Sequence, residues 1–224
     1  MKTKPLTLTL LTLLLLCTAR SWSSPVSEPP HVFWTQQAIS ILQIHRDQVK
    51  VERLDPKRSS FRLDLPFLGR SCRIIRPDLV KPAPQRVLTK GPIFLLSDVH
   101  GRLDAFMHLL TTHGVLDRKG RWAWGKGTLV VLGDLFDRGT EVTELLWLVY
   151  TLQEEASRKG GAVHFVLGNH EIMVLSGDLR YVHKRYRKLE QVVGLALPDI
   201  YGKDTILGHW LRTRPVMMLL NRNL

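Results

Sequence analysis

Three clusters of polar residues, each directly after a short apolar run, hold the side chains best suited to chemistry. They occupy residues 97–101, 133–139 and 168–171. Asp98, His100 and Asp134 offer the carboxylate oxygens and imidazole nitrogen that bind divalent ions such as Mn, Fe or Zn. Asn169 offers a neutral carbonyl oxygen to a second ion. The residue types therefore predict a metal site, although each aspartate taken alone is more often a turn or cap residue.

The same clusters contain groups suited to phosphate chemistry. Two ions about 3.5–4 Å apart can clamp a phosphate and lower the pKa of a bridging water. The guanidinium of Arg138 matches phosphate oxygens. His170 can protonate a leaving alkoxide, and Asp137 can hold that imidazole in its protonated form. We therefore predict phosphate contacts for Arg138, Asn169 and His170, with His170, Asp137 and Arg138 as the catalytic group.

The elements that must position these clusters alternate along the chain. Apolar segments at 93–96, 128–132 and 162–167 predict three strands, and the apolar spacing over 103–113 and 140–158 predicts two helices. Strands alternating with helices indicate parallel strands in an α/β arrangement. Because ligands bind at the carboxyl ends of such strands, the three clusters should converge on one cleft. We expect Thr140 to cap the second helix.

In order and combination, the three clusters resemble the motifs of a known family. They read D-x-H-G at 98–101, G-D-x-x-D-R-G at 133–139 and G-N-H-E at 168–171. Together they resemble the calcineurin-like metallophosphoesterases. The arginine of the second motif is similar to the phosphoprotein-phosphatase branch, and the export signal described below favours its Shewanella-like phosphatase group. The resemblance implies a four-layer α-β-β-α sandwich of mixed sheets.

The resemblance also implies a role for each motif residue. Asp98, His100 and Asp134 would hold the first of two divalent ions (Mn, Fe or Zn), and Asp134 and Asn169 the second. Arg138 would bind phosphate, and His170, supported by Asp137, would be the general acid. The implied activity is hydrolysis of a phosphomonoester. A phosphoserine or phosphothreonine protein is the leading substrate, with phosphotyrosine and small phosphoesters left open.

The chain departs from the family pattern downstream of the third motif. Family members complete the second metal site with two further histidines, one in a His-Gly-Gly-like turn. No His-Gly pair follows His170; His183 lies in a basic run, and His209 precedes an apolar segment at 215–220. We interpret residues 91–224 as a C-terminally incomplete metallophosphoesterase domain that binds the second ion weakly or not at all. The alternative is a protein that binds metal or phosphorylated partners without turnover.

The N-terminal residues resemble a targeting signal. Lys2 and Lys4 precede a run of leucine and threonine at 6–16 and then small residues, which is typical of a secretory signal peptide over 1–21. The run is shorter than the roughly 20 residues of a membrane span. Lipidation at Cys17 is the less favoured alternative, because Leu16 is not small. We therefore expect an exported protein, with a linker and an N-terminal β-hairpin region over 22–90 and flexible chain at 21–30.

Composition excludes several classes of protein. The 224 residues include 32 Lys+Arg and 20 Asp+Glu, for a formal charge of +12, and 44% are hydrophobic. These proportions exclude a wholly disordered chain, and two cysteines exclude a disulfide scaffold. Cys72 is expected to be a small buried or half-buried residue. The basic stretch at 180–188 is the best nucleic-acid candidate, but we favour a solvated helix face near the cleft. An intermediate interpretation is that it steers anionic phosphorylated substrates to the metals. The oligomeric state is left open.

Overall fold

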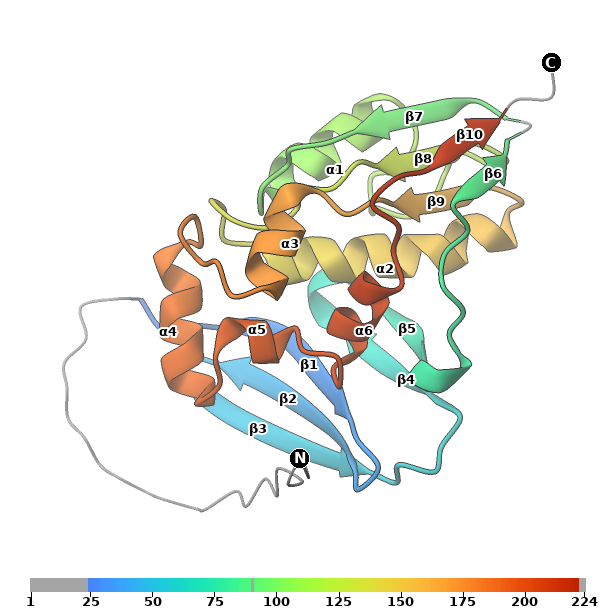
Figure 1. The fold of residues 1–224 in the computed structure, drawn as a ribbon. Helices are drawn as coiled ribbons and strands as arrows, with labels where there is room; N and C mark the ends of the chain where they lie inside the picture. Colours follow the sequence, from blue (N-terminus) through green and yellow to red (C-terminus); the bar gives the residue numbers. More distant parts are fainter. Residues whose placement is uncertain (1–23, 90, 222–224) are drawn as a thin grey trace, which may run out of the picture.

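A three-stranded parallel sheet lies at the centre of the predicted α/β region. The computed structural model describes residues 24–89 and 91–221 (Figure 1). Its strands are β7 (Ile93–Leu96), β8 (Thr128–Val131) and β9 (Ala162–Phe165), hydrogen-bonded in the order β7-β8-β9. All neighbours are parallel. The predicted strands are confirmed, and their carboxyl ends lie at one edge of the sheet.

The two predicted helices are α1 (Leu103–Thr112) and α2 (Val142–Arg158). Residues 145–149 of α2 are consecutive, apolar and fully buried. A helix that is apolar on all sides must be covered on all sides. Accordingly, α2 lies between the β7–β9 sheet and the N-terminal strands (Figure 1), and the Trp147 indole N–H donates to the Pro30 carbonyl at 3.0 Å.

The expected cap of α2 is wrong. Thr140 lies outside the helix, and Glu141, at the N-cap position, makes no side-chain capping bond. Instead, the backbone N–H of Val142 donates to the hydroxyl of Tyr186 at 2.8 Å. A helix leaves its first N–H groups without partners, and here a tyrosine from a distant segment satisfies one of them.

The N-terminal region contains more regular structure than the sequence indicated. Strands β1 (Glu28–Trp34), β2 (Ile39–His45) and β3 (Gln48–Leu54) form an antiparallel sheet. This confirms the predicted hairpin. Arg46 and Asp47, both with positive φ, form the two-residue turn between β2 and β3. Strands β4 (Ser60–Leu65) and β5 (Arg70–Ile75) form a second antiparallel pair.

Residues 28–30, expected to be flexible, are instead buried in β1. The reason is the carboxylate of Glu28, which accepts a hydrogen bond from the Thr143 hydroxyl of α2 and pairs with Arg185. A buried carboxylate with these partners fixes the strand in place. The predicted signal peptide at 1–21 lies outside the described residues. Cys72, expected to be buried, is 3% exposed.

The remaining elements lie around this core. Helices α3 (Asn169–Leu175), α4 (Lys184–Val193), α5 (Leu197–Ile200) and α6 (Ile206–Arg212) follow β9. Short 3-10 helices occupy Pro66–Leu68 and Pro77–Leu79. Strand β10 (Leu219–Asn221) pairs in parallel with β6 (Arg86–Leu88). Within the described ranges, no helix has the length and apolar character needed to cross a bilayer.

Candidate functional site

Glu171 holds two of the three motif loops together. Its carboxylate is fully buried and accepts hydrogen bonds from four backbone N–H groups, at 2.8 to 3.2 Å. The donors are Asp134, Leu135, Phe136 and Gly168. Burial raises the pKa of Glu171, and the four amides act in the opposite direction because they stabilise the ionised form. The loop after β8 is thereby fixed against the start of α3.

The orientation of His100 leaves one ring nitrogen free for a ligand. Its Nδ1 lies 2.9 Å from the carbonyl oxygen of Phe136. A carbonyl can only accept, so Nδ1 carries a proton, and in the neutral imidazole Nε2 keeps its lone pair. That Nε2 atom is buried and has no hydrogen-bond partner in the described part of the chain. A buried acceptor of this kind, oriented by a backbone carbonyl, fits a metal ligand.

Two further residues contribute ligand atoms beside His100. One atom each from His100, Asp134 and His170 lie within 4.8 Å of one another. Asp134 is 9% exposed, and its Oδ1 accepts a hydrogen bond from the His170 backbone N–H at 3.0 Å. The His100 and His170 rings meet edge to face, with their centroids 4.7 Å apart. The donor set of two imidazoles and a carboxylate suits a divalent transition metal.

His170 is paired with Asp137, as the sequence predicts. The His170 Nδ1 lies 2.6 Å from Asp137 Oδ2, and both side chains are nearly inaccessible. Burial raises the pKa of Asp137, and the hydrogen bond and charge of His170 act against that rise. Since Nδ1 is used by this contact, only Nε2 of His170 can face a metal or a substrate.

The structure places the other predicted residues at the solvent side of the site. Asp98 Oδ1 lies 3.7 Å from His100 Nε2, but the Asp98 side chain is 67% exposed. Asn169 is exposed, and its amide lies 4.0 Å from the Met173 sulfur. Arg138 is exposed as well. Asp98, His100 and Arg138 line one open cleft of about 440 Å³, whereas Asn169 is not part of its lining.

Backbone strain is concentrated at this site. Five non-glycine residues of the first two motifs have positive φ: Asp98, His100, Asp134, Asp137 and Arg138. Such conformations cost about 1–3 kcal/mol each and persist only where surrounding contacts impose them. Gly168 meets a different requirement, because a Cβ there would lie 2.2 Å from Asp134 Oδ1. The third motif therefore needs a glycine beside the carboxylate of the second.

Sequence reasoning missed three groups at the site. Glu171 belongs to the third motif, but its residue type did not indicate its role. A charged residue within the apolar pattern of a helix was the available signal. The Phe136 carbonyl could not be identified, because backbone groups leave no trace in residue types. The third is Tyr181, which is 49% exposed and whose ring lies 5.4 Å from that of His170.

The basic stretch at 180–188 is only partly a solvated helix face. Arg180 pairs with Asp178, and Arg185 pairs with Glu28. Lys188 contacts Asp47 at 2.8 Å. Tyr186 is buried, at 2% exposure, beside Asp137. The expectation of a solvated helix face therefore holds for Lys184 and for Arg187, which is exposed although it pairs with Glu190, but is wrong for the inner side of α4.

Comparison with known proteins identifies the family. The family model described as calcineurin-like phosphoesterase matches residues 91–214, which is more than half of the chain. The protein belongs to this family, and the resemblance seen in its motifs is confirmed.

Individual relatives agree with this assignment. Shewanella-like protein phosphatase 2 of Arabidopsis thaliana is 37% identical over 130 residues, which are 58% of this chain and 30% of that protein. A symmetrical bis(5'-nucleosyl)-tetraphosphatase of Acidovorax sp. (strain JS42) is 31% identical over 125 residues, 55% of this chain and 37% of that protein.

A solved structure supports the expected fold. The crystal structure of the cold-active protein-tyrosine phosphatase of a psychrophilic Shewanella species aligns with a TM-score of 0.75 and 32% identity. It covers 88% of this chain and 59% of that one. The mixed α/β architecture is thus similar to a metallophosphoesterase fold. The chain spans about a third of the length of the two curated relatives from Arabidopsis thaliana and Acidovorax sp..

Proposed function

We propose that this protein hydrolyses phosphate monoesters with the help of bound divalent ions. The observation that carries the proposal is the free, buried Nε2 of His100, which lies within 4.8 Å of an Asp134 carboxylate oxygen, with the His170 ring beside them. Arg138, an exposed cation suited to phosphate, lines the same cleft as His100. Membership of the calcineurin-like family supports this chemistry.

The residues present fit the implied metal site. His100 and Asp134, joined by the nearby Asp98, would hold the first ion; Asp134 and Asn169 would contribute to a second. When bound, a divalent ion supplies Lewis acidity toward phosphoryl oxygens and toward an attacking water. The number of ions and their identity (Mn, Fe or Zn) are part of the proposal.

The chain's own residues account for the rest of the reaction. The Arg138 guanidinium binds the phosphoryl oxygens and offsets charge that grows in the transition state. Asp137 holds the Nδ1–H of His170, so that a proton on Nε2 points away from the buried pair. His170 donates that proton to the leaving oxygen, with Asn169 beside it contacting the phosphate.

The substrate and the cellular location belong to the proposal as well. We propose a phosphorylated protein, with phosphoserine or phosphothreonine as the sequence resemblance suggests. The similar Shewanella protein is named a protein-tyrosine phosphatase, which keeps phosphotyrosine open. A small phosphoester is a further option, and nucleic acid is not favoured. We propose export through the signal at 1–21.

A second candidate function is binding without turnover. Among the described residues, His100 and His170 are the only histidines in the metal-ligand cluster. His183 instead caps α4, accepting the Arg185 backbone N–H, and His209 lies within α6. A site with few ligands for the second ion would bind metal and phosphate yet turn over slowly.

The decisive experiment measures Mn²⁺-dependent hydrolysis of p-nitrophenyl phosphate by the purified chain, alongside its metal content. Asp134→Asn removes the proposed shared ligand, and Asp64→Asn changes an exposed aspartate of β4 as a control. Activity lost only in Asp134→Asn supports the hydrolase. Equal activity in both variants refutes the metal site. Bound Mn²⁺ and phosphate without hydrolysis in the wild type would favour the binding protein.

A further inference from the structure

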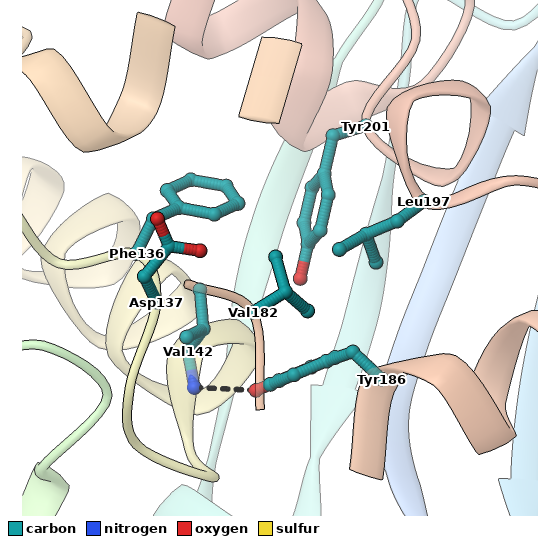
Figure 2. Close-up of a pocket in the computed structure, with 7 residues that line it drawn as sticks. All are labelled: Phe136, Asp137, Val142, Val182, Tyr186, Leu197 and Tyr201. Carbon is teal, nitrogen blue, oxygen red and sulfur yellow. Dashed lines mark hydrogen bonds between the residues drawn. The ribbon is translucent and has the colours of Figure 1, made fainter. Parts of the chain in front are cut away.

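We propose that Tyr186, a residue outside the three motifs, positions the loop that carries Asp137 and Arg138. The inference rests on the proposed function, since it concerns phosphate binding at the same site. Tyr186 lies in α4, 48 residues after Arg138 in the sequence. Figure 2 shows its hydroxyl directed at the start of α2, with Asp137 lining the same packed pocket.

The hydroxyl of Tyr186 makes one hydrogen bond to the first residue of α2 and one to the end of the loop. It accepts a hydrogen bond from the Val142 N–H at 2.8 Å and donates one to the Thr140 carbonyl at 3.1 Å. Thr140 is two residues from Arg138. The ring is 2% exposed, so water cannot readily replace either bond. One side-chain oxygen thus fixes the backbone at the end of the phosphate-binding loop.

The loop requires such fixation because of its backbone conformation. Asp137 and Arg138 are consecutive non-glycine residues with φ values of 69° and 60°. Residues in this region return to ordinary conformations unless their surroundings prevent it. The Asp137 carboxylate is held by His170, and the Arg138 N–H donates to the Tyr181 carbonyl at 3.0 Å. Tyr186 adds a constraint on the far side of Arg138, where the Glu141 N–H also donates to the Gly101 carbonyl at 3.0 Å.

Helix α4 can serve as an anchor because it is itself held firmly. The neighbouring residue Arg185 pairs with the buried Glu28 and donates to the Ser27 carbonyl. One turn further on, Lys188 donates to the Ser24 carbonyl and contacts Asp47. Tyr186 therefore projects from a helix fixed to β1 and to the β2–β3 turn, and its hydroxyl has little freedom to follow a displaced loop.

A purely structural role is the rival explanation. Val142 is the first residue of α2, and the hydroxyl could serve only to satisfy one of the helix's unpaired N–H groups. In that case, loss of the hydroxyl would lower the melting temperature and leave phosphate binding unchanged. The contact with Thr140 favours the positioning role, since this carbonyl belongs to the loop rather than to the helix.

The test compares Tyr186→Phe with Tyr201→Phe in the Mn²⁺-loaded chain. Tyr201 lines the same pocket, and its hydroxyl is hydrogen-bonded to Thr143 of α2 at 2.7 Å, but it does not contact residues 137–140 by a hydrogen bond among those described. Both variants keep the ring and lose one buried hydroxyl, so their melting temperatures should fall by similar amounts. The readouts are kcat and KM for p-nitrophenyl phosphate and the Kd of inorganic phosphate by calorimetry.

We expect Tyr186→Phe to raise KM and the phosphate Kd by about tenfold, because small displacements of a binding group have large effects. Tyr201→Phe should change neither, and Mn²⁺ content should be equal in all three proteins. Equal phosphate Kd values in the wild type and Tyr186→Phe would overturn the inference. A wild type that binds phosphate without turnover would refute only the proposed hydrolase, and one that binds no phosphate would refute both.

Discussion

At the scale of single residues, the site depends on which atoms remain free. The types and spacing of Asp98, His100 and Asp134 were enough to predict metal chemistry, and the geometry groups two of them with His170. The protonation of the His100 ring was not predictable, because it follows from a backbone carbonyl of Phe136. Residue types indicate which side chains can bind a metal ion. Hydrogen bonds decide which ring nitrogen of a histidine is available to do so.

Glu171 illustrates how one residue can control ligands that it does not touch. Its four backbone hydrogen bonds require an acceptor with two charged oxygens. In Glu171→Gln, an amide NH₂ would face N–H donors. Because hydrogen bonds to charged groups contribute about 1.5–3 kcal/mol each, we expect unfolding free energy to fall by at least about 2 kcal/mol. Denaturant unfolding would measure this loss.

The matched control for this prediction is Glu52→Gln, which makes the same change at an exposed position of β3. Its unfolding free energy should stay within about 0.5 kcal/mol of the wild type. Mn²⁺ affinity should also fall in Glu171→Gln, since Asp134 would lose its fixed backbone. If Glu171→Gln kept the stability and the Mn²⁺ affinity of the wild type, the charged hydrogen bonds of Glu171 would be dispensable.

At the scale of elements, the sequence predicted what repeats locally and missed what depends on distant partners. Strands β7–β9 and helices α1 and α2 followed from apolar periodicity. Residues 28–30 were expected to be flexible because proline and glutamate dominate them, yet Glu28 is buried against Thr143 and Arg185. No local pattern encodes a partner more than 100 residues away. Tyr186 and Val142, which are 44 residues apart, were equally invisible to local patterns.

Glu28 of β1, Glu144 of α2 and Arg185 of α4 form a cluster of charged groups inside the fold. This cluster should make stability depend on pH. Burial and the nearby Glu28 raise the pKa of Glu144 to about 8; Arg185 acts in the opposite direction, and Glu141 adds to the rise. The folded state therefore binds a proton that the unfolded state, with a pKa near 4.5, has released. Stability contributed by this group is present below pH 4.5 and is lost progressively up to about pH 8.

Glu144→Gln tests this dependence, since a glutamine keeps the size of the side chain and does not ionise. We expect the variant to gain melting temperature relative to the wild type as pH rises from 5 to 8. Glu52→Gln, which makes the same change at an exposed position of β3 outside this cluster, is the control. A constant difference between Glu144→Gln and the wild type across that range would mean that Glu144 is ionised throughout.

At the scale of the whole molecule, charge and topology act together. The formal charge of +12 attracts anionic substrates, but Arg180, Arg185 and Lys188 are engaged in ion pairs within the fold. The exposed Arg138, which lines the cleft, is therefore the cation best placed to meet an anion there. It lies beside the strand ends that the parallel topology brings together. Topology explains why three motifs spread over 74 residues meet; composition alone only excluded classes of protein.

Metal binding should be linked to the stability of the whole fold. An ion that binds only the folded state stabilises it by about 2.7 kcal/mol at a concentration one hundred times its Kd. For a chain of this size, such a gain raises the melting temperature by several degrees. The wild type should show this rise with Mn²⁺, measured by calorimetry. His100→Ala should abolish the rise, whereas His108→Ala, at an exposed position of α1, should retain it. Because each variant is compared with itself, a general destabilisation cannot imitate the result; an undiminished rise in His100→Ala would place the ion elsewhere.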